Sequence, residues 1–280
     1  MSATSEPRQP MSNLQLRIIS AVVLAAVVLL MTWRGGGPFR LLSVVIAVGM
    51  FVELCRMSRN DSNWFNQSVA AVFFAVAMLA LLFNVQALLV LLMLAAGIVV
   101  TLLYSVLSKT DRWTTIALAY AGFSGAALAY LRADDGRGLA AILFLFAVVW
   151  ATDILAYFVG RIIGGPKLAP SISPGKTQSG AIGGLIGGAL SALILVSWLD
   201  LGNPLLYVGL ALVLSALSQV GDLFESWIKR QHGVKDSSQI IPGHGGVMDR
   251  VDGLVIAAIA LYVAGVFGGG LDFPAHGIFG

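Results

Sequence analysis

Long apolar runs follow one another along almost the whole chain, separated by short polar connections. A helix that crosses the hydrocarbon core of a bilayer needs about 20 mostly apolar residues. On that measure the sequence predicts about nine such helices, at about 15–33, 38–57, 67–83, 85–107, 114–131, 138–162, 180–199, 204–228 and 251–270. The chain is therefore expected to be an all-α, polytopic integral membrane protein.

The composition supports this class. The 280 residues are 58% hydrophobic and only 11% charged, whereas a soluble domain is about half apolar and about a quarter charged. Cys55 is the only cysteine, so the chain forms no intrachain disulfide and no cysteine metal cluster. We interpret Cys55 as a small apolar side chain at a helix end.

The organisation is predicted from the same runs. Residues 1–13 are polar and are expected to be disordered. No A-x-A-like cleavage site follows the first apolar run, so we interpret that run as a retained helix and not as a signal peptide. Residues 14–135 are expected to be structural and lipid-facing. Residues 136–280 are expected to carry the chemistry, with polar loops at 163–179 and 229–250.

The Lys and Arg residues predict the orientation, because cytoplasmic loops are enriched in them. With a cytoplasmic N-terminus and nine helices, 13 of the 17 fall on the cytoplasmic side. The other 4 are Arg34, Arg40, Arg132 and Arg137. We therefore expect the N-terminus and both polar loops in the cytoplasm and the C-terminus on the opposite side, in the cell inner (plasma) membrane.

Glycines recur at four-residue spacing in 180–188, as Gly180, Gly184 and Gly188 and as Gly183 and Gly187. This spacing lets helix backbones approach closely in lipid, so it predicts close helix packing.

Charge gathers between Ser226 and Asp252, at one end of two apolar runs. Such a cluster at a membrane edge indicates a functional site. Its candidate catalytic residues are Ser226, Lys229, Arg230, Lys235, Asp236, His244, Asp249, Arg250 and Asp252, with Asp222 just upstream.

The carboxylates in this region suggest a metal site. Asp222 shares a helix face with Ser226 and Lys229, and Asp249 and Asp252 are three residues apart. Mg²⁺ takes one or two carboxylates together with water and substrate phosphates, so these three aspartates are candidate ligands. The alternative is that Asp222 pairs with Lys229 or Arg230, and Asp249 with Arg250, in ordinary interfacial ion pairs.

The glycines at 243, 245 and 246 suggest an anion site. Gly243, Gly245 and Gly246 allow backbone N–H groups to face an anion. With the nearby Lys and Arg side chains, a polyanion such as a nucleoside triphosphate fits. The alternative is a cytoplasmic hairpin that binds anionic lipid headgroups.

Two further groups of polar residues are expected on the same side of the membrane. Asp153 lies within an apolar run and needs a partner from another helix. The loop 167–177 offers Lys167, Ser173, Lys176 and Thr177. It is not a P-loop, because Ala169 stands where that motif has its first glycine and because the loop follows a membrane helix.

Together these residues resemble the phosphatidate cytidylyltransferase family, also called CDP-diacylglycerol synthases. The match is carried by Ser226-x2-Lys229-Arg230-x4-Lys235-Asp236-x5-Pro242-Gly-His244-Gly-Gly-x2-Asp249-Arg250-x-Asp252, and upstream by Asp222, Lys167-Leu-Ala-Pro, Ser173-Pro-Gly-Lys176-Thr177 and Asp153. It covers about 150–255. Family members usually carry small or hydroxyl residues where Ile154 and Leu155 stand, and Trp then Glu or Gln where Gln178 and Ser179 stand.

The resemblance implies transfer of CMP from CTP to phosphatidic acid, giving CDP-diacylglycerol and pyrophosphate. It implies one or two Mg²⁺ ions on Asp222, Asp249 and Asp252 and allows a monovalent cation such as K⁺. It implies phosphate contacts from the basic residues and from Lys176 and Thr177. The expected partners are CTP, phosphatidic acid and the bilayer, with no nucleic acid; a homodimer is compatible with the glycine-spaced helix.

Three alternatives remain open at this point. One is a transferase that consumes CDP-diacylglycerol, of whose motif only Asp252-Gly253 is present. Another is an ion-coupled transporter that uses Asp153 and Asp222. The third is an inactive homologue that acts as a scaffold. A CTP-dependent lipid product would distinguish an active cytidylyltransferase from the last two.

Overall fold

The computed structural model describes residues 13–58, 63–199, 202–241 and 245–280. The described residues form nine long α-helices, two short strands and one 3₁₀ helix. The helices are α1 (Asn13–Arg34), α2 (Gly36–Met57), α3 (Trp64–Leu82), α4 (Ala87–Leu107), α5 (Trp113–Arg132), α6 (Gly136–Ile163), α7 (Gln178–Leu199), α8 (Pro204–Gln231) and α9 (Met248–Gly269), the strands are β1 (Lys167–Ala169) and β2 (Ser173–Thr177), and the 3₁₀ helix is η1 (Pro274–Gly277).

The predicted fold class is confirmed. Eight helices, α2 to α9, are long and apolar enough to cross a membrane. The helix α1 has 22 residues, and its side chains are described from residue 21 onward. Every predicted helix is present, with ends within one helical turn of the expected positions. The expected disorder of residues 1–13 falls almost entirely outside the described residues.

Local signals explain several helix ends. Asn84 takes a left-handed backbone conformation, with φ of 58°, and it separates α3 from α4 where the apolar pattern is interrupted. Asn63 and Asn203 each accept a hydrogen bond from a backbone N–H in the first turn of α3 and α8, respectively. Such side chains satisfy donors that a helix start leaves without partners.

The polar loop between α6 and α7 is more ordered than the sequence predicts. Its strands β1 and β2 pair antiparallel, with Lys167 opposite Thr177 and Ala169 opposite Ser173. The strands are too short to give a clear alternating pattern, which is why the sequence indicates only a loop. The hairpin ends directly at α7, so its last residues are held against the bundle.

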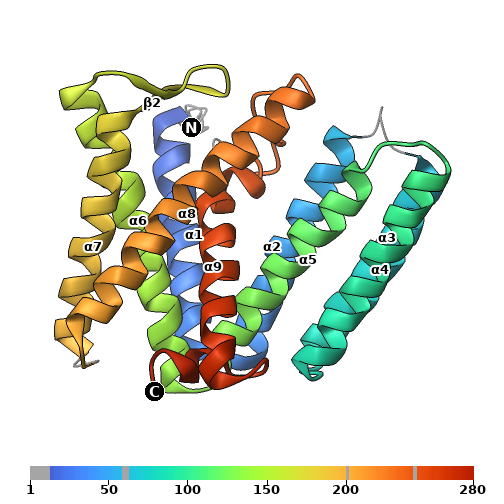
Figure 1. Cartoon of the computed structure of the whole chain (residues 1–280), viewed down its shortest axis with the longest axis horizontal. Helices are drawn as coiled ribbons and strands as arrows, with labels where there is room; N and C mark the ends of the chain where they lie inside the picture. Colours follow the sequence, from blue (N-terminus) through green and yellow to red (C-terminus); the bar gives the residue numbers. More distant parts are fainter. Residues whose placement is uncertain (1–12, 59–62, 200–201, 242–244) are drawn as a thin grey trace, which may run out of the picture.

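The two polar loops lie at the same end of the helix bundle. In Figure 1 the β-hairpin and the connection from α8 to α9 are at the end where α1 begins, and the C-terminus is at the other end. The helices α3 and α4 form a hairpin at one side, and α6, α7 and α8 form the other side. The prediction that both loops share one side of the membrane therefore agrees with the arrangement, and the cytoplasmic assignment of that side stays a prediction.

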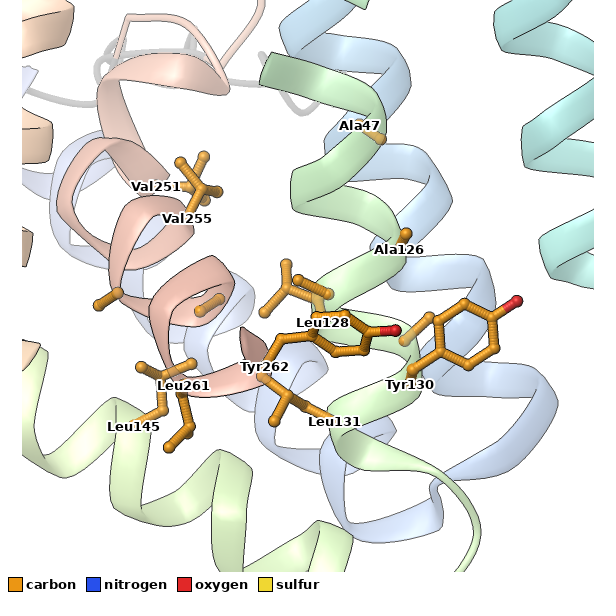
Figure 2. Close-up of a cluster of buried hydrophobic side chains, with 14 of the residues drawn as sticks. Ala47, Ala126, Leu128, Tyr130, Leu131, Leu145, Val251, Val255, Leu261 and Tyr262 are labelled. Atoms are coloured by element: carbon orange, nitrogen blue, oxygen red, sulfur yellow. The ribbon is translucent and has the colours of Figure 1, made fainter. Parts of the chain in front are cut away.

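The core lies where α9 packs on α5 and α2. Figure 2 shows Val251 and Val255 on the side of α9 that faces α5, Tyr262 beside Leu128 and Leu131 of α5, and Leu261 beside Leu145 of α6. The most apolar 18-residue window of α5 is 83% buried, against 28% for α4. The helix α5 is therefore enclosed by protein, whereas α4 presents most of its surface to lipid.

The glycines of α7 produce close contact with α6, as their spacing predicts. A Cβ at Gly187 would meet the carbonyl oxygen of Ala151 at 2.7 Å, and a Cβ at Gly180 would meet that of Ala156 at 2.7 Å. Both neighbours are backbone atoms and cannot rotate away. The prediction of close packing by these residues is confirmed, and the contact is made within one chain.

Gly187→Ala is expected to destabilise the protein, because the new methyl group would push α7 away from α6. Overpacking of this kind costs about 1–3 kcal/mol. Thermal unfolding of detergent-purified protein, followed by the loss of the monodisperse peak in gel filtration, measures the effect. Gly209→Ala on α8 is the control, because nothing lies within 4 Å of a Cβ there. Equal stability of the two variants would contradict the prediction.

Candidate active site

A cavity of about 620 Å³ opens between α6, the β-hairpin, the start of α7 and α8. The β-hairpin that forms one wall of this cavity is at the end of the bundle that carries both polar loops (Figure 1). Five residues that the sequence singles out line it: Asp153, Lys167, Lys176, Thr177 and Asp222. Three others that the sequence assigns no role, Tyr157, Arg161 and Gln219, line it as well.

Lys176 of β2 forms an ion pair with Asp222 of α8 across this cavity. The sequence-based alternative gave Asp222 a partner on its own helix, Lys229 or Arg230. The hairpin instead supplies the partner, because β2 projects Lys176 over the mouth of the cavity. The side chains of both residues are only partly buried, so the pair remains accessible to a ligand.

Thr177 has a structural role beside the cavity. Its side-chain oxygen accepts a hydrogen bond from the backbone N–H of Gly180, 3.1 Å away, in the first turn of α7. This contact satisfies a donor that a helix start leaves without a partner. Thr177 therefore fixes the junction between β2 and α7, and with it the position of Lys176.

Asp252 of α9 belongs to the same acidic group. Asp153 and Asp222 line the cavity, and Asp252 lies within electrostatic range of both. Helices α8 and α9 are in backbone contact at this level, since a Cβ at Gly221 would meet the carbonyl oxygen of Asp252 at 2.7 Å. The sequence could not show that Asp153, far away in the chain, joins this group.

Lys229 is more buried than Lys176 and lies between two carboxylates. Its Nζ is 3.0 Å from Glu225 Oε1 and 2.6 Å from Asp249 Oδ1. Glu225 is fully buried, and the side chains of Lys229 and Asp249 are 12% and 8% exposed. A buried carboxylate needs a partner of opposite charge, and Lys229 provides it for both.

Asp249 also accepts hydrogen bonds from the loop that precedes α9. Its Oδ2 lies 2.9 Å from the backbone N of Ser237, 2.7 Å from Ser237 Oγ and 2.9 Å from the backbone N of Gly246. The sequence-based alternative of a pair with Arg250 is not what forms: Asp249 pairs with Lys229, and Arg250 is exposed. Asp249 therefore ties α8, the loop and α9 together.

The remaining predicted residues surround these contacts. Ser226 is half-buried on α8, and Ser173 is half-buried in β2. The exposed charged residues of the loop region are Arg230, Lys235, Asp236 and Arg250. Gly245 has a φ of +82°, a conformation that favours glycine, and Gly246 is buried. Gly243 and His244 lie outside the described residues.

Glu53 of α2 is the main contributor that the sequence does not single out. It is fully buried and accepts hydrogen bonds from the loop before α9. The available signal was a lone carboxylate near the end of an apolar run. That signal does not reveal that a helix from the N-terminal half reaches the loop.

The predicted metal ligands do not form one group of three in this arrangement. No set of three or more His, Cys, Asp or Glu side chains is placed to hold a metal ion within the part of the chain that is described. Both oxygens of Asp249 are taken up by Lys229, Ser237 and Gly246. Asp222 and Asp252 fit the donor set of Mg²⁺, which completes its shell with water and substrate phosphates.

Comparison with known proteins supports the resemblance that the sequence motif indicates. The sequence model of the cytidylyltransferase family matches residues 15–267. A protein of Brucella suis biovar 1 named phosphatidate cytidylyltransferase is 47% identical over 270 residues, which are 95% of this chain and 98% of the relative. One of the same name from Staphylococcus haemolyticus is 34% identical over 253 residues, covering 85% of this chain and 94% of the relative.

These matches extend well beyond the stretch that carries the sequence motif. They include α1 to α5, where the sequence alone shows only apolar runs. The chain belongs to the cytidylyltransferase family.

Proposed function

We propose that this protein transfers CMP from CTP to phosphatidic acid, giving CDP-diacylglycerol and pyrophosphate. The observation that carries the proposal is the cavity at one end of the membrane helices, where Lys176 and Asp222 meet. The names of the relatives supply the substrates. A polyanionic nucleotide needs basic groups in a cavity that is open to water, and a lipid substrate needs access from the bilayer.

The reaction requires little acid–base chemistry from the protein. A phosphate oxygen of the lipid, already ionised at neutral pH, attacks the α-phosphorus of CTP. A new P–O bond forms, and the bond from the α-phosphorus to the bridging oxygen of the β-phosphate breaks. Pyrophosphate leaves with that electron pair. Catalysis then consists mainly of positioning two anions and stabilising charge on the transferred group.

The basic residues of the site suit this task. Lys176 lines the cavity, and Arg230, Lys235 and Arg250 are exposed at the same end of the bundle. In the proposal these four bind the phosphates of CTP and of the lipid. The side chain of Lys229 is more buried than these four, and its ion pairs with Glu225 and Asp249 hold α8 against α9.

Asp222 and Asp252 are proposed to hold Mg²⁺, with Asp153 lining the same cavity as Asp222. When bound, the ion would neutralise charge on the attacking and leaving phosphate oxygens. Lys176 would then exchange its contact with Asp222 for a contact with substrate phosphate. The sequence also predicts Asp249 as a ligand, but in this proposal Asp249 positions Lys229 and the loop before α9, because both of its oxygens already accept other hydrogen bonds.

The lipid is proposed to approach from the side of α6. Asp153 and Tyr157 line the cavity and are exposed, and the neighbouring Ile154 and Phe158 present apolar surface beside them. Acyl chains would stay in the bilayer along this face, while the phosphate reaches the cavity. With the predicted orientation in the inner membrane, CTP arrives from the cytoplasm. A homodimer remains part of the proposal and is not needed for this geometry.

Purified protein in phosphatidic acid liposomes is expected to convert CTP into CDP-diacylglycerol, and EDTA is expected to abolish the product. Radiolabelled CTP and thin-layer chromatography of the lipid fraction measure this. Restored product after excess Mg²⁺ shows that EDTA acted through the metal. A well-folded wild-type protein that makes no product with any divalent cation would overturn the proposed reaction in favour of a transporter or a scaffold.

Asp222→Asn and Lys176→Ala are each expected to lower kcat/KM for CTP by at least about 100-fold, the scale of losing one preorganised electrostatic contact. Steady-state rates at several CTP concentrations measure the loss. Asp134→Asn is the matched control, because Asp134 is an exposed carboxylate paired with Arg40 at the other end of the bundle. If either cavity variant keeps the wild-type kcat/KM, the cavity is not the nucleotide site.

Asp252→Asn and Asp249→Asn are expected to respond differently to Mg²⁺. Asp252→Asn should raise the Mg²⁺ concentration for half-maximal activity by at least about tenfold, because a carboxylate ligand is lost. Asp249→Asn should lower kcat at saturating Mg²⁺ and leave that concentration unchanged. A Mg²⁺ titration of the initial rate distinguishes the two. A larger Mg²⁺ shift in Asp249→Asn than in Asp252→Asn would make Asp249 the ligand.

A further inference from the structure

A fully buried carboxylate of the N-terminal half reaches the loop that carries the sequence motif. Glu53 lies one turn from the end of α2, and no part of it is exposed. Its oxygens accept hydrogen bonds from the backbone N–H groups of Val247 and Met248, both at 2.8 Å. They also accept from the hydroxyls of Ser237, at 3.0 Å, and Ser238, at 2.6 Å.

These four donors explain why a charge is tolerated there. A buried carboxylate without partners is strongly unfavourable, and charge-assisted hydrogen bonds offset the loss of water. Val247 and Met248 are at the start of α9, where backbone N–H groups lack partners within the helix and the helix dipole favours a negative charge. Glu53 therefore caps α9 from another helix.

The surrounding backbone fits closely around Glu53. A Cβ at Gly246 would overlap both Ser237 Oγ and Glu53, and a Cβ at Gly49 would meet Val247 Cγ2 at 2.8 Å. The loop and α2 are thus in contact along a full helical turn. Neither glycine can be enlarged without moving the loop.

Ser237 connects Glu53 to the candidate active site. Its hydroxyl lies between the two carboxylates, 3.0 Å from Glu53 Oε2 and 2.7 Å from Asp249 Oδ2, and they share its one proton. Asp249 in turn contacts Lys229, which contacts Glu225. A continuous path of hydrogen bonds and ion pairs therefore runs from α2 through the loop to α9 and α8.

We propose that Glu53 is a positioning residue for cytidylyl transfer, acting through Ser237 to hold the described ends of the loop between α8 and α9, Asp249 and Lys229 in place. Glu53 itself is enclosed by the loop and touches no part of the cavity. The inference rests on the proposed function for its kinetic part. Its structural part, that Glu53 holds the loop, is independent of any activity.

Glu53→Gln is the central variant, because it keeps the size and places an NH₂ group where the backbone N–H donors need an acceptor. It is expected to lower kcat at least about tenfold, the effect of a small displacement of catalytic groups, with KM for CTP changed less than about threefold. In liposomes without substrate, trypsin is expected to cleave after Lys235, an exposed residue between α8 and α9 that lies two residues before Ser237, several times faster than in wild type. A variant with wild-type kcat and wild-type cleavage would overturn the proposal.

Asn66→Ala is the matched control for a purely structural effect. Asn66 is a buried polar residue of the same N-terminal half, and its side chain bonds Ser105, 2.9 Å away, between α3 and α4. It is expected to lower the melting temperature while leaving kcat and the cleavage of the loop unchanged. A loss of kcat equal to that of Glu53→Gln would show that any loss of stability lowers activity, and would overturn the positioning role.

A double-mutant cycle tests the path through Ser237. If Glu53 acts through Ser237, the double variant Glu53→Gln, Ser237→Ala should lose little more activity than the worse single variant. Additive losses would exclude this path. If Glu53→Gln does not fold, Ser238→Ala tests the proposal instead, because Ser238 contacts Glu53 and not Asp249. Faster loop cleavage and a lower kcat in this variant would support the proposal, and wild-type values would overturn it.

The two proposals fail in different ways. A wild-type protein without lipid product removes the proposed reaction, and the trypsin experiment still decides whether Glu53 holds the loop. An active wild type whose Glu53→Gln variant matches it in both rate and cleavage removes only the role of Glu53.

Discussion

Burial of charge at one end of a membrane helix bundle is the constraint on which this site depends. Lys229 lies between Glu225 and Asp249, with all three side chains nearly or fully buried. Breaking such a pair by removing one partner is destabilising by about 3–5 kcal/mol, because an uncompensated charge stays behind. These ion pairs hold α8 against α9 near Lys229, and the two backbones are also in contact where Gly221 meets the carbonyl oxygen of Asp252.

Two further contacts position the elements that line the cavity beside α8 and α9. The glycines of α7 bring its backbone against α6, and Thr177 joins β2 to the first turn of α7. The hairpin then projects Lys176 onto Asp222 of α8. The cavity thus depends on small residues that allow close approach as much as on the charged residues that line it.

Much of this arrangement is readable from the sequence, because a bilayer imposes a simple length rule on apolar helices. The helices, the sharing of one end by the two loops and the close packing of the α7 glycines all follow from local patterns. The pairing of charges does not. Asp222 pairs with Lys176 of the hairpin and Asp249 with Lys229, whereas spacing along the chain favoured partners on the same helix or next in sequence.

The sequence by itself determined the class of protein, the number of helices and the motif, since these depend on composition and on spacing along one segment. The tertiary structure alone decided which segments meet: Asp153 and Asp222 at one cavity, and Glu53 with the start of α9. A buried carboxylate in an apolar run signals that a partner must exist. Which donor it finds depends on how distant helices pack, and no local pattern records that.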